Sequence, residues 1–328
     1  MSVESVEELQ DRAASQANVP DPVEAFRARI TSSEFGAISR ITSRVLTELQ
    51  EYALDRGFLQ ILPVMISPFT DPLNHAVYPA SIKYEHRTLQ LTASMIFHKQ
   101  LALNLGGVNG IFIVSPNIRL EKSEIKNSEN HLIEFSQFDL EIKNADMKDV
   151  IDFVDGMVRS TINNIRNKCA EELNSVGRSL PSFDEPFPIF SSEQLREQYG
   201  DDFESVISQK CNTPCFVTNF KREFYDRESP DRRGIYNNFD LIYPEGYGEG
   251  LSGAEREFEF EQICYRMREL DMDLEPFREY LKAAERGIIP RTAGAGLGIQ
   301  RFVKFIAGVR SIRDVCLFDR SISSDFLF

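Results

Sequence analysis

Apolar residues recur at every third or fourth position in two long segments of the chain. In residues 33–56 this repeat predicts an amphipathic helix, and Gly57 is the kind of residue at which such helices commonly end. A second repeat over 150–169 predicts another long helix with one buried stripe. The apolar positions of the two stripes are Phe35, Ile38, Ile41, Val45, Leu49 and Tyr52, and then Val150, Ile151, Val154, Met157, Val158, Ile162, Ile165 and Cys169.

Several other segments alternate between apolar and polar residues, which is the pattern of β-strands. The segments "GIFIVSPNIRLEK" (110–122) and "HLIEFSQFDLEI" (131–142) are predicted to form two antiparallel strands joined by a polar loop. Further strands are predicted at 58–66, 87–94, 214–220, 238–253 and 291–298, and shorter helices at 94–106, 254–270 and 277–287. More strands follow one another directly, without a helix between them, than a parallel βαβ pattern would contain. We therefore predict an α+β fold, an antiparallel sheet flanked by helices.

The predicted organisation is a single large domain over residues 33–328. Residues 1–32 precede it as a short acidic arm, and residues 175–215 form a less regular insert with one or two short helices. At 328 residues the chain is long enough for a substantial hydrophobic core.

The net charge of −14 argues against a general attraction to nucleic acid, so any phosphate-binding surface has to be local. No run of about 18 apolar residues occurs, so no membrane-spanning segment is predicted. The five cysteines are odd in number and scattered, which favours reduced thiols and a cytoplasmic location. Cys211 and Cys215 lack the further ligands that a zinc site needs.

The strand over 131–142 has an unusual polar face. Phe135, Gln137, Asp139 and Glu141 share that face, whereas Ser136, Phe138, Leu140 and Ile142 share the opposite one. On the preceding strand Asn117, Arg119 and Glu121 lie together in the same way. Such a face either contacts solvent, with ion pairs across the strands, or contacts a ligand.

Two glycine-containing segments favour the ligand. "GYGEGLSGAERE" (246–257) sets Glu249, Ser252 and Arg256 among glycines, where a backbone can approach a ligand closely. "GAGLGIQR" (294–301) has glycines at alternate positions of a strand, which predicts a flat floor, and Arg301 follows. Neither segment has the lysine and Ser/Thr of a P-loop or the pattern of a dinucleotide site. A glycine floor with arginines and carboxylates predicts a nucleoside triphosphate site on an open sheet.

These segments, taken in order, resemble the class II aminoacyl-tRNA synthetases, in particular their aspartyl/asparaginyl branch. "GFLQILPVMISP" (57–68) is similar to motif 1, which forms the dimer interface in that family. "IRLEK" with "NHLIEF" is similar to motif 2, and "GAGLGIQRFVKFIAG" to motif 3. "LSGAER" resembles the segment between them that is typical of this branch. The resemblance covers about residues 33–320.

The resemblance implies a site for ATP and Mg²⁺. Arg119 would bind the α-phosphate together with the carboxylate under attack, and Arg301 would join it in catalysis. Phe135 and Arg301 would lie on the two faces of the adenine, above the floor that contains Gly298. Glu121, His131 and Glu134 would contact the adenine edge and the outer phosphates. The magnesium ligands would be Glu249 and Ser252, oxygen donors that suit a hard cation.

The resemblance also implies an acidic amino-acid substrate. Lys99 and Arg256 match the lysine and arginine that hold a carboxylate, and this lysine favours aspartate. Ser94 belongs to the same substrate-binding segment, "TASMIFHKQ" (92–100), but Met95 and Ile96 replace the expected proline and glutamine. Asp71 or Gln137 is therefore expected to take over the contact with the amino group.

The part of the chain before motif 1, about 32 residues, is too short for the anticodon-binding barrel of this branch. In the segments "SPFTDPL", "SMIFHKQ" and "REFYDRE" (222–228), the chain resembles the archaeal-type asparagine synthetase A. The expected activity is an AMP-forming ligase that adenylates aspartate and transfers the acyl group to ammonia. We therefore expect a homodimer that does not use tRNA. Two alternatives stay open: an amide ligase with an aspartate-like acid and another amine, and a non-catalytic, synthetase-like regulator or tRNA-binding protein.

Overall fold

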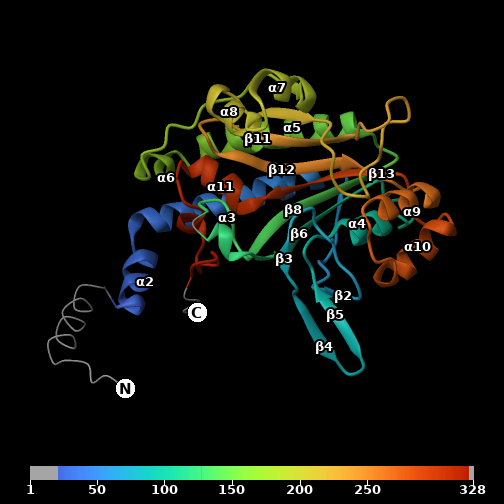
Figure 1. Cartoon of the computed structure of the whole chain (residues 1–328). Coiled ribbons are helices and arrows are strands. Elements are labelled where there is room, and N and C mark those ends of the chain that lie inside the picture. Colours follow the sequence, from blue (N-terminus) through green and yellow to red (C-terminus); the bar gives the residue numbers. More distant parts are fainter. Residues whose placement is uncertain (1–20, 127, 325–328) are drawn as a thin grey trace.

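A mixed sheet of eight strands forms the centre of the computed structural model, which describes residues 21–126 and 128–324. The strand order is β1-β6-β8-β13-β12-β11-β10-β9, and only the outermost pairs, β1 with β6 and β10 with β9, are parallel (Figure 1). The strands are β1 (Leu59–Gln60), β6 (Gly110–Ile118), β8 (Glu134–Lys143), β9 (Ile189–Ser191), β10 (Cys215–Thr218), β11 (Asn238–Tyr243), β12 (Gly248–Glu255) and β13 (Thr292–Gly298). The predicted α+β architecture with an antiparallel sheet is confirmed.

The two predicted amphipathic helices form and pack against this sheet. They are α3 (Ser33–Leu54) and α5 (Met147–Lys168), and α11 (Ile299–Ala307) joins them. Every apolar position of the predicted stripes except the half-buried Tyr52 is buried, and most belong to one cluster with Phe138 and Leu140 of the sheet. One face of the sheet is thus sealed by helices, which leaves the other face available for a site.

Smaller elements border the second face. Helices α4 (Ile96–Ala102), α9 (Phe260–Glu269) and α10 (Arg278–Glu285) share an aromatic cluster that includes Phe97 and Phe224. Strands β2 (Ile66–Ser67), β4 (Ser81–Tyr84) and β5 (Arg87–Leu91) form a separate sheet whose hairpin extends from the body (Figure 1). Strands β3 (Val77–Tyr78) and β7 (Leu120–Glu121) make a two-stranded pair.

The predicted irregular insert contains two helices, α7 (Ser192–Tyr199) and α8 (Phe203–Lys210), besides β9. They follow α6 (Ala170–Ser175) and pack over the β10–β11 end of the sheet. Short 3₁₀ turns occur at Ser123–Ile125, Glu275–Phe277 and Ile312–Val315. The helix predicted over 254–270 begins later, at Phe260, because Ala254 and Glu255 continue the ladder between β12 and β13.

Helix α2 (Pro22–Ile30) belongs to the predicted N-terminal arm and contacts the C-terminal segment. The Asp21 carboxylate caps its first turn, and Phe26 stacks on Phe318. Arg29 donates hydrogen bonds to the carbonyls of Arg313 and Cys316. The first 20 residues of the arm lie outside the described residues. The boundary at residue 33 and the homodimer remain predictions. No helix among the described residues is long and apolar enough to span a membrane.

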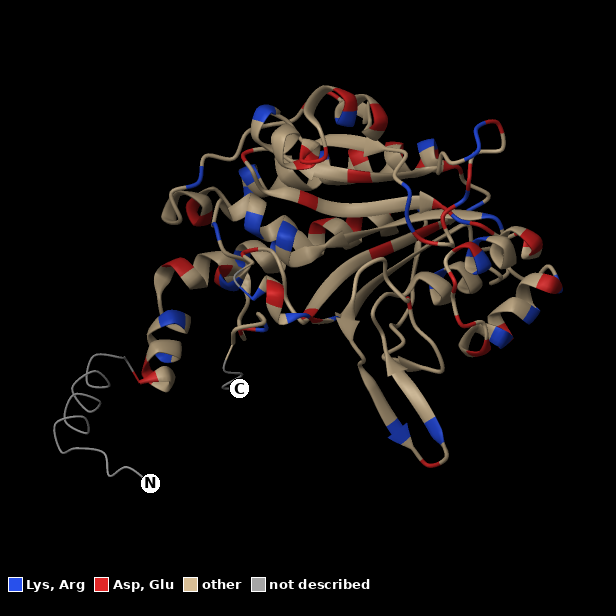
Figure 2. Cartoon of the chain, in the orientation of Figure 1, with Lys and Arg blue, Asp and Glu red and all other residues tan. Residues whose placement is uncertain are grey.

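Figure 2 marks the Lys and Arg positions and the Asp and Glu positions along the ribbon, and the two kinds are interspersed over the helices and loops. Any recognition of phosphate therefore depends on a few arginines placed locally, as the net charge of the sequence suggests.

Candidate active site

A cavity of about 330 Å³ opens on the uncovered face of the sheet. Strands β8, β12 and β13 form its floor, and residues 71–75, 94–99, 119–121, 130–132 and 222–226 form its walls. Thirteen of the fourteen residues predicted for the site line it: Asp71, Ser94, Lys99, Arg119, Glu121, His131, Phe135, Gln137, Glu249, Ser252, Arg256, Gly298 and Arg301. Segments far apart in the sequence therefore meet at one cavity.

Glu134 lies outside this cavity. Its carboxylate is exposed and lies 3.6 Å from Nε of Arg320, next to a second groove on the far side of β8. The alternation of the strand explains the difference, because neighbouring residues point to opposite faces. Phe135 faces the cavity, so the adjacent Glu134 does not. The predicted contact of Glu134 with a nucleotide is not consistent with this placement.

Arg119 enters the cavity from the junction of β6 and β7. Its Nε donates a 3.1 Å hydrogen bond to the carbonyl of Ala93, and its guanidinium carbon lies 5.2 Å from the centre of the Phe135 ring. This is the geometry of a cation–π contact. The other nitrogens of Arg119 have no hydrogen-bond partner among the described residues and are available to an anion.

Arg301, at the start of α11, makes two contacts that were not predicted. Its Nη1 forms a 2.8 Å ion pair with Oε2 of Glu249 and its Nε donates to the carbonyl of Asn130. The pKa of Glu249 lies below its usual range: burial opposes this shift, but the positive charges of Arg301 and Arg222 outweigh it. Glu249 is therefore a carboxylate at neutral pH.

A second buried carboxylate lies next to Ser252 at this end of the cavity. Asp240 on β11 faces Ser252 in the ladder and accepts a 2.7 Å hydrogen bond from its hydroxyl, and the same hydroxyl lies 3.3 Å from Glu249. Among the described residues no group of three or more His, Cys, Asp or Glu forms a complete metal cluster. Magnesium, however, is commonly held by one or two carboxylates together with substrate phosphates, and Glu249, Asp240 and Ser252 fit that donor set.

Asp240 was not predicted as a site residue. The signal in the sequence was an aspartate inside the otherwise apolar strand "NFDLIY". Such a carboxylate needs a partner or a function when it is buried. Burial raises its pKa to about 7, in spite of the nearby Arg222 guanidinium.

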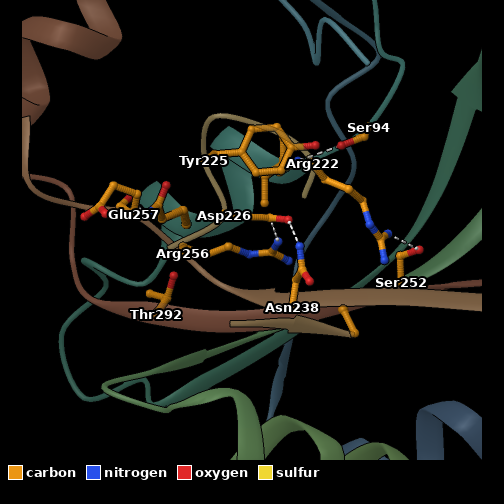
Figure 3. Close-up of polar contacts among 12 residues, drawn as sticks. Ser94, Arg222, Tyr225, Asp226, Asn238, Ser252, Arg256, Glu257 and Thr292 are labelled. Carbon is orange, nitrogen blue, oxygen red and sulfur yellow. Dashed lines mark hydrogen bonds and ion pairs between the residues drawn. The ribbon is translucent and has the colours of Figure 1, made fainter. Parts of the chain in front are cut away.

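The segment "REFYDRE" (222–228) folds over the cavity, although none of its residues was predicted for the site. Arg222 contacts Ser252 at 3.3 Å and Asp240 at 2.8 Å. Asn238 holds the segment: its amide accepts from the Phe220 N–H at 2.7 Å and donates to Asp226 at 2.7 Å. Figure 3 shows Arg222 reaching Ser252, with Asp226 between Asn238 and Arg256.

The deep end of the cavity contains a buried network of charges. Nζ of Lys99 lies 2.9 Å from Asp139 and 3.6 Å from Glu141, and Nε of Arg256 lies 3.2 Å from Glu141. Arg256 also lies 3.7 Å from Asp226. Nζ of Lys99 also donates to the carbonyl of Ala295 at 3.2 Å. These contacts fix both cations in place beside the cavity.

The glycines of β13 differ in what they make room for. A Cβ at Gly294 would lie 2.0 Å from a carboxylate oxygen of Glu141, so this position accommodates the buried network instead of a ligand. Gly296 and Gly298 line the cavity. The predicted bare floor is thus limited to the second half of the strand.

Histidine residues close the outer part of the cavity. Nε2 of His75 lies 3.1 Å from both carboxylate oxygens of Glu121, a contact that was not predicted. His131 is paired with the Ser128 hydroxyl at 2.6 Å. Burial, with Arg301 close by, lowers the pKa of His131. Its ring is therefore largely neutral at pH 7.

Comparisons with known proteins agree with this architecture and site. The family model described as "tRNA synthetases class II (D, K and N)" matches residues 26–321. The fold and the site thus define a class II synthetase core. The chain belongs to the class II tRNA synthetase family for aspartate, lysine and asparagine.

Individual relatives lie in the aspartate and asparagine branches. The chain is 28% identical to an aspartate–tRNA(Asp) ligase of Thermoplasma acidophilum, over 92% of this chain and 74% of the relative. It is 28% identical to an asparagine–tRNA ligase of Pyrococcus abyssi, over 89% and 70%. The structure of asparaginyl-tRNA synthetase from Pyrococcus horikoshii complexed with asparaginyl-adenylate superposes with a TM-score of 0.81 at 23% identity, over 93% and 74%.

These relatives correct two predictions. The proteins that the chain matches are named as ligases that join an amino acid to tRNA, which contradicts ammonia as the acceptor of the acyl group. They equally contradict the prediction that tRNA is not a partner. The synthetase core of the aspartate/asparagine type is confirmed, whereas the assignment to asparagine synthetase A is not supported.

Proposed function

We propose that the protein is an ATP-dependent ligase that activates aspartate as its adenylate and transfers the aspartyl group to the 3′ end of tRNA. The observation that carries the choice of amino acid is the pair of buried cations, Lys99 and Arg256, at the closed end of the cavity. Both side chains line the cavity, and two cations favour a carboxylate over a neutral carboxamide.

In the first step a carboxylate oxygen of the amino acid attacks the α-phosphorus of ATP. The bond from that phosphorus to the bridging oxygen breaks, and pyrophosphate leaves. Negative charge on the α-phosphate oxygens is stabilised by Arg119, whose outer nitrogens face the cavity. Phe135 provides the flat apolar surface for the adenine, backed by the guanidinium of Arg119.

Glu249 and Ser252, joined by Asp240, would hold Mg²⁺. When bound, the ion would draw phosphate oxygens together and neutralise part of their charge. Arg301 keeps Glu249 oriented, and Arg222 does the same for Asp240. These contacts fix the donor oxygens before substrate arrives, which lowers the cost of arranging them during the reaction.

In the second step a hydroxyl of the terminal ribose of tRNA attacks the carbonyl carbon of the adenylate. The bond between that carbon and the phosphate oxygen breaks, AMP leaves, and the hydroxyl proton goes to the departing phosphate or to water. The names of the relatives are the support for tRNA as the acceptor.

The test has two parts. ATP–pyrophosphate exchange is measured with aspartate, asparagine and lysine, and charging is then measured with labelled amino acid and total tRNA. We expect the rate of exchange with aspartate to be at least about 100-fold above the rate with asparagine. Replacing the charged carboxylate by a neutral carboxamide in a site that matches the carboxylate costs about 3 kcal/mol or more. Exchange with asparagine in preference to aspartate would overturn the choice of substrate. Exchange without charging of any tRNA would overturn the choice of acceptor.

A further inference from the structure

Three carboxylates line one wall of the cavity beside the buried cations. They belong to Asp71, Glu223 and Asp226, and two of them are already engaged. Asp71 accepts hydrogen bonds from the Tyr225 hydroxyl at 2.9 Å and from the Leu73 N–H at 3.0 Å. Asp226 accepts from Asn238 and lies opposite Arg256.

Glu223 differs from the other two. Apart from a hydrogen bond with its own backbone, its carboxylate makes no hydrogen bond or ion pair with any residue in ranges 21–126 and 128–324, although it is half-buried and lines the cavity. The charged groups that face it are Asp226 and Arg222 of its own segment and Asp71 of the opposite loop. Burial, together with the negative charges of Asp226 and Asp71, raises the pKa of Glu223 to about 8. A cation bound here would meet the Glu223 carboxylate, a hydrogen-bond acceptor that no donor of another described residue occupies.

Gln137, Ser94 and Ile96, which also line the cavity, differ from Glu223 because each is hydrogen-bonded to another residue or is apolar. Oε1 of Gln137 accepts a 2.8 Å hydrogen bond from Asn117, and Oγ of Ser94 accepts from the N–H of Ile96. Ile96 lines the cavity with a hydrocarbon side chain. The two residues expected from the sequence to bind the amino group, Asp71 and Gln137, are therefore already paired.

We propose that Glu223 is the specificity-determining residue that binds the α-ammonium group of the amino-acid substrate. This inference rests on the proposed function, because it requires an amino acid in the cavity. The ammonium would lie against the wall formed by Glu223 and Asp71, while Lys99 and Arg256 receive the side-chain carboxylate. Recognition of the two ends by opposite charges also fixes which carboxylate reaches the α-phosphate.

The experiment compares an amino acid with its analogue that lacks the amino group. Binding of L-aspartate and of succinate is measured by calorimetry for the wild type, for Glu223→Gln and for the control Glu261→Gln, whose side chain is exposed on α9. In Glu223→Gln we expect aspartate to bind about 30-fold more weakly and succinate to bind within about threefold of the wild type, since a charge-assisted hydrogen bond is lost only with the amine. Glu261→Gln should leave both affinities unchanged.

Proton release supplies a second readout. Glu223 has to ionise when the ammonium binds, so wild-type protein at pH 7 should release up to about one proton per bound aspartate, measured in buffers of different ionisation enthalpy. Glu223→Gln should lose this release. Equal weakening of aspartate and succinate, or proton release that persists in the variant, would show that Glu223 has only a structural role.

The outcome is separable from that of the proposed function. If wild-type protein activates asparagine instead of aspartate, the assignment of the substrate fails, and the same comparison is made between asparagine and succinamate. A selective loss of asparagine binding in Glu223→Gln would then still support the ammonium contact. If the wild type binds neither amino acid, both the function and this inference are overturned.

Discussion

Nζ of Lys99 lies 2.9 Å from Oδ1 of Asp139, and both side chains are almost completely buried. The two residues come from α4 and β8, and the contact joins the cavity wall to its floor. Buried ions of this kind are tolerated only when each has a partner, because removal from water costs several kcal/mol per ion.

Replacing Lys99 by Met should therefore destabilise the protein. The change leaves Asp139 and Glu141 with less compensating charge, and we expect the free energy of unfolding to fall by about 3 kcal/mol in urea titrations at pH 7.5. Lys83→Met, on the exposed hairpin, is the control and should change the free energy of unfolding by less than about 0.5 kcal/mol. Unchanged stability of Lys99→Met would mean that water replaces the lysine.

Arg119→Ala should abolish most of the adenylation activity without unfolding the protein. The guanidinium is predicted to stabilise charge that grows in the transition state, so kcat in ATP–pyrophosphate exchange should fall by about 10³-fold. Lys126→Ala removes an exposed positive charge from the same loop region and should have little effect. A variant of Arg119 with wild-type turnover would remove the chemical basis of the proposed function.

Glu249→Gln should raise the concentration of Mg²⁺ needed for half-maximal exchange. One charged oxygen donor is lost, and Arg301 loses its ion-pair partner, so we expect a shift of about 10- to 100-fold. Glu197→Gln on α7 is exposed and serves as the matched control. An unchanged Mg²⁺ requirement would place the metal elsewhere.

Asn238→Ala should loosen the segment over 220–228. The amide of Asn238 pairs with both backbone groups of Phe220 and with Asp226, so its loss leaves buried polar groups unpaired and should cost about 2 kcal/mol of stability. Limited proteolysis should then cleave within 221–234 faster than in the wild type, with Asn174→Ala on α6 as the control. If cleavage there is not accelerated, other contacts of the segment hold it.

The pH dependence of stability should also report on Glu223. Its pKa in the folded protein, about 8, exceeds the value of 4.5 expected when unfolded, so the folded state binds more protons between these values. Its contribution to the free energy of unfolding therefore decreases as pH rises from about 5 to about 8. Glu223→Gln should match the wild type at pH 5 and be more stable by roughly 1 to 2 kcal/mol at pH 8.

Thermal and urea unfolding at the two pH values would measure this difference. Asp240 and Asp226, whose pKa values are raised as well, contribute in the same direction in both proteins. The free energy of unfolding of the variant should therefore still decrease with pH, but less steeply than that of the wild type. If the difference in stability between the variant and the wild type were the same at pH 5 and pH 8, Glu223 would be ionised in the folded protein throughout this range.

The hairpin of β6 and β8 illustrates what could be predicted. Alternation correctly placed Phe138 and Leu140 on the core face, and it grouped Phe135 with Gln137 on the opposite face, which lines the cavity. The motifs that resembled a synthetase correctly identified the family. Glu134 was misplaced because its role came from the resemblance, although alternation already put it on the opposite face from Phe135.

Other parts of the site depended on contacts distant in sequence. Asp240 and Ser252 are close only because β11 and β12 pair in one register, with a β-bulge near Leu241. Arg222 was not predicted for the site, since nothing in the local sequence shows that Asn238 binds that segment. His75 reaches Glu121 because β3 pairs with β7.

The sequence by itself determined the helices, most of the strands and the residue types available for chemistry, because periodicity and turn propensity act over a few neighbouring positions. The tertiary structure alone decided which charges neutralise one another. It engaged Asp71 with Tyr225 and left Glu223 lining the cavity without a partner in another described residue. The energy of a buried charge depends on groups within a few ångströms, and the order of the strands in the sheet, not their order in the chain, sets those distances.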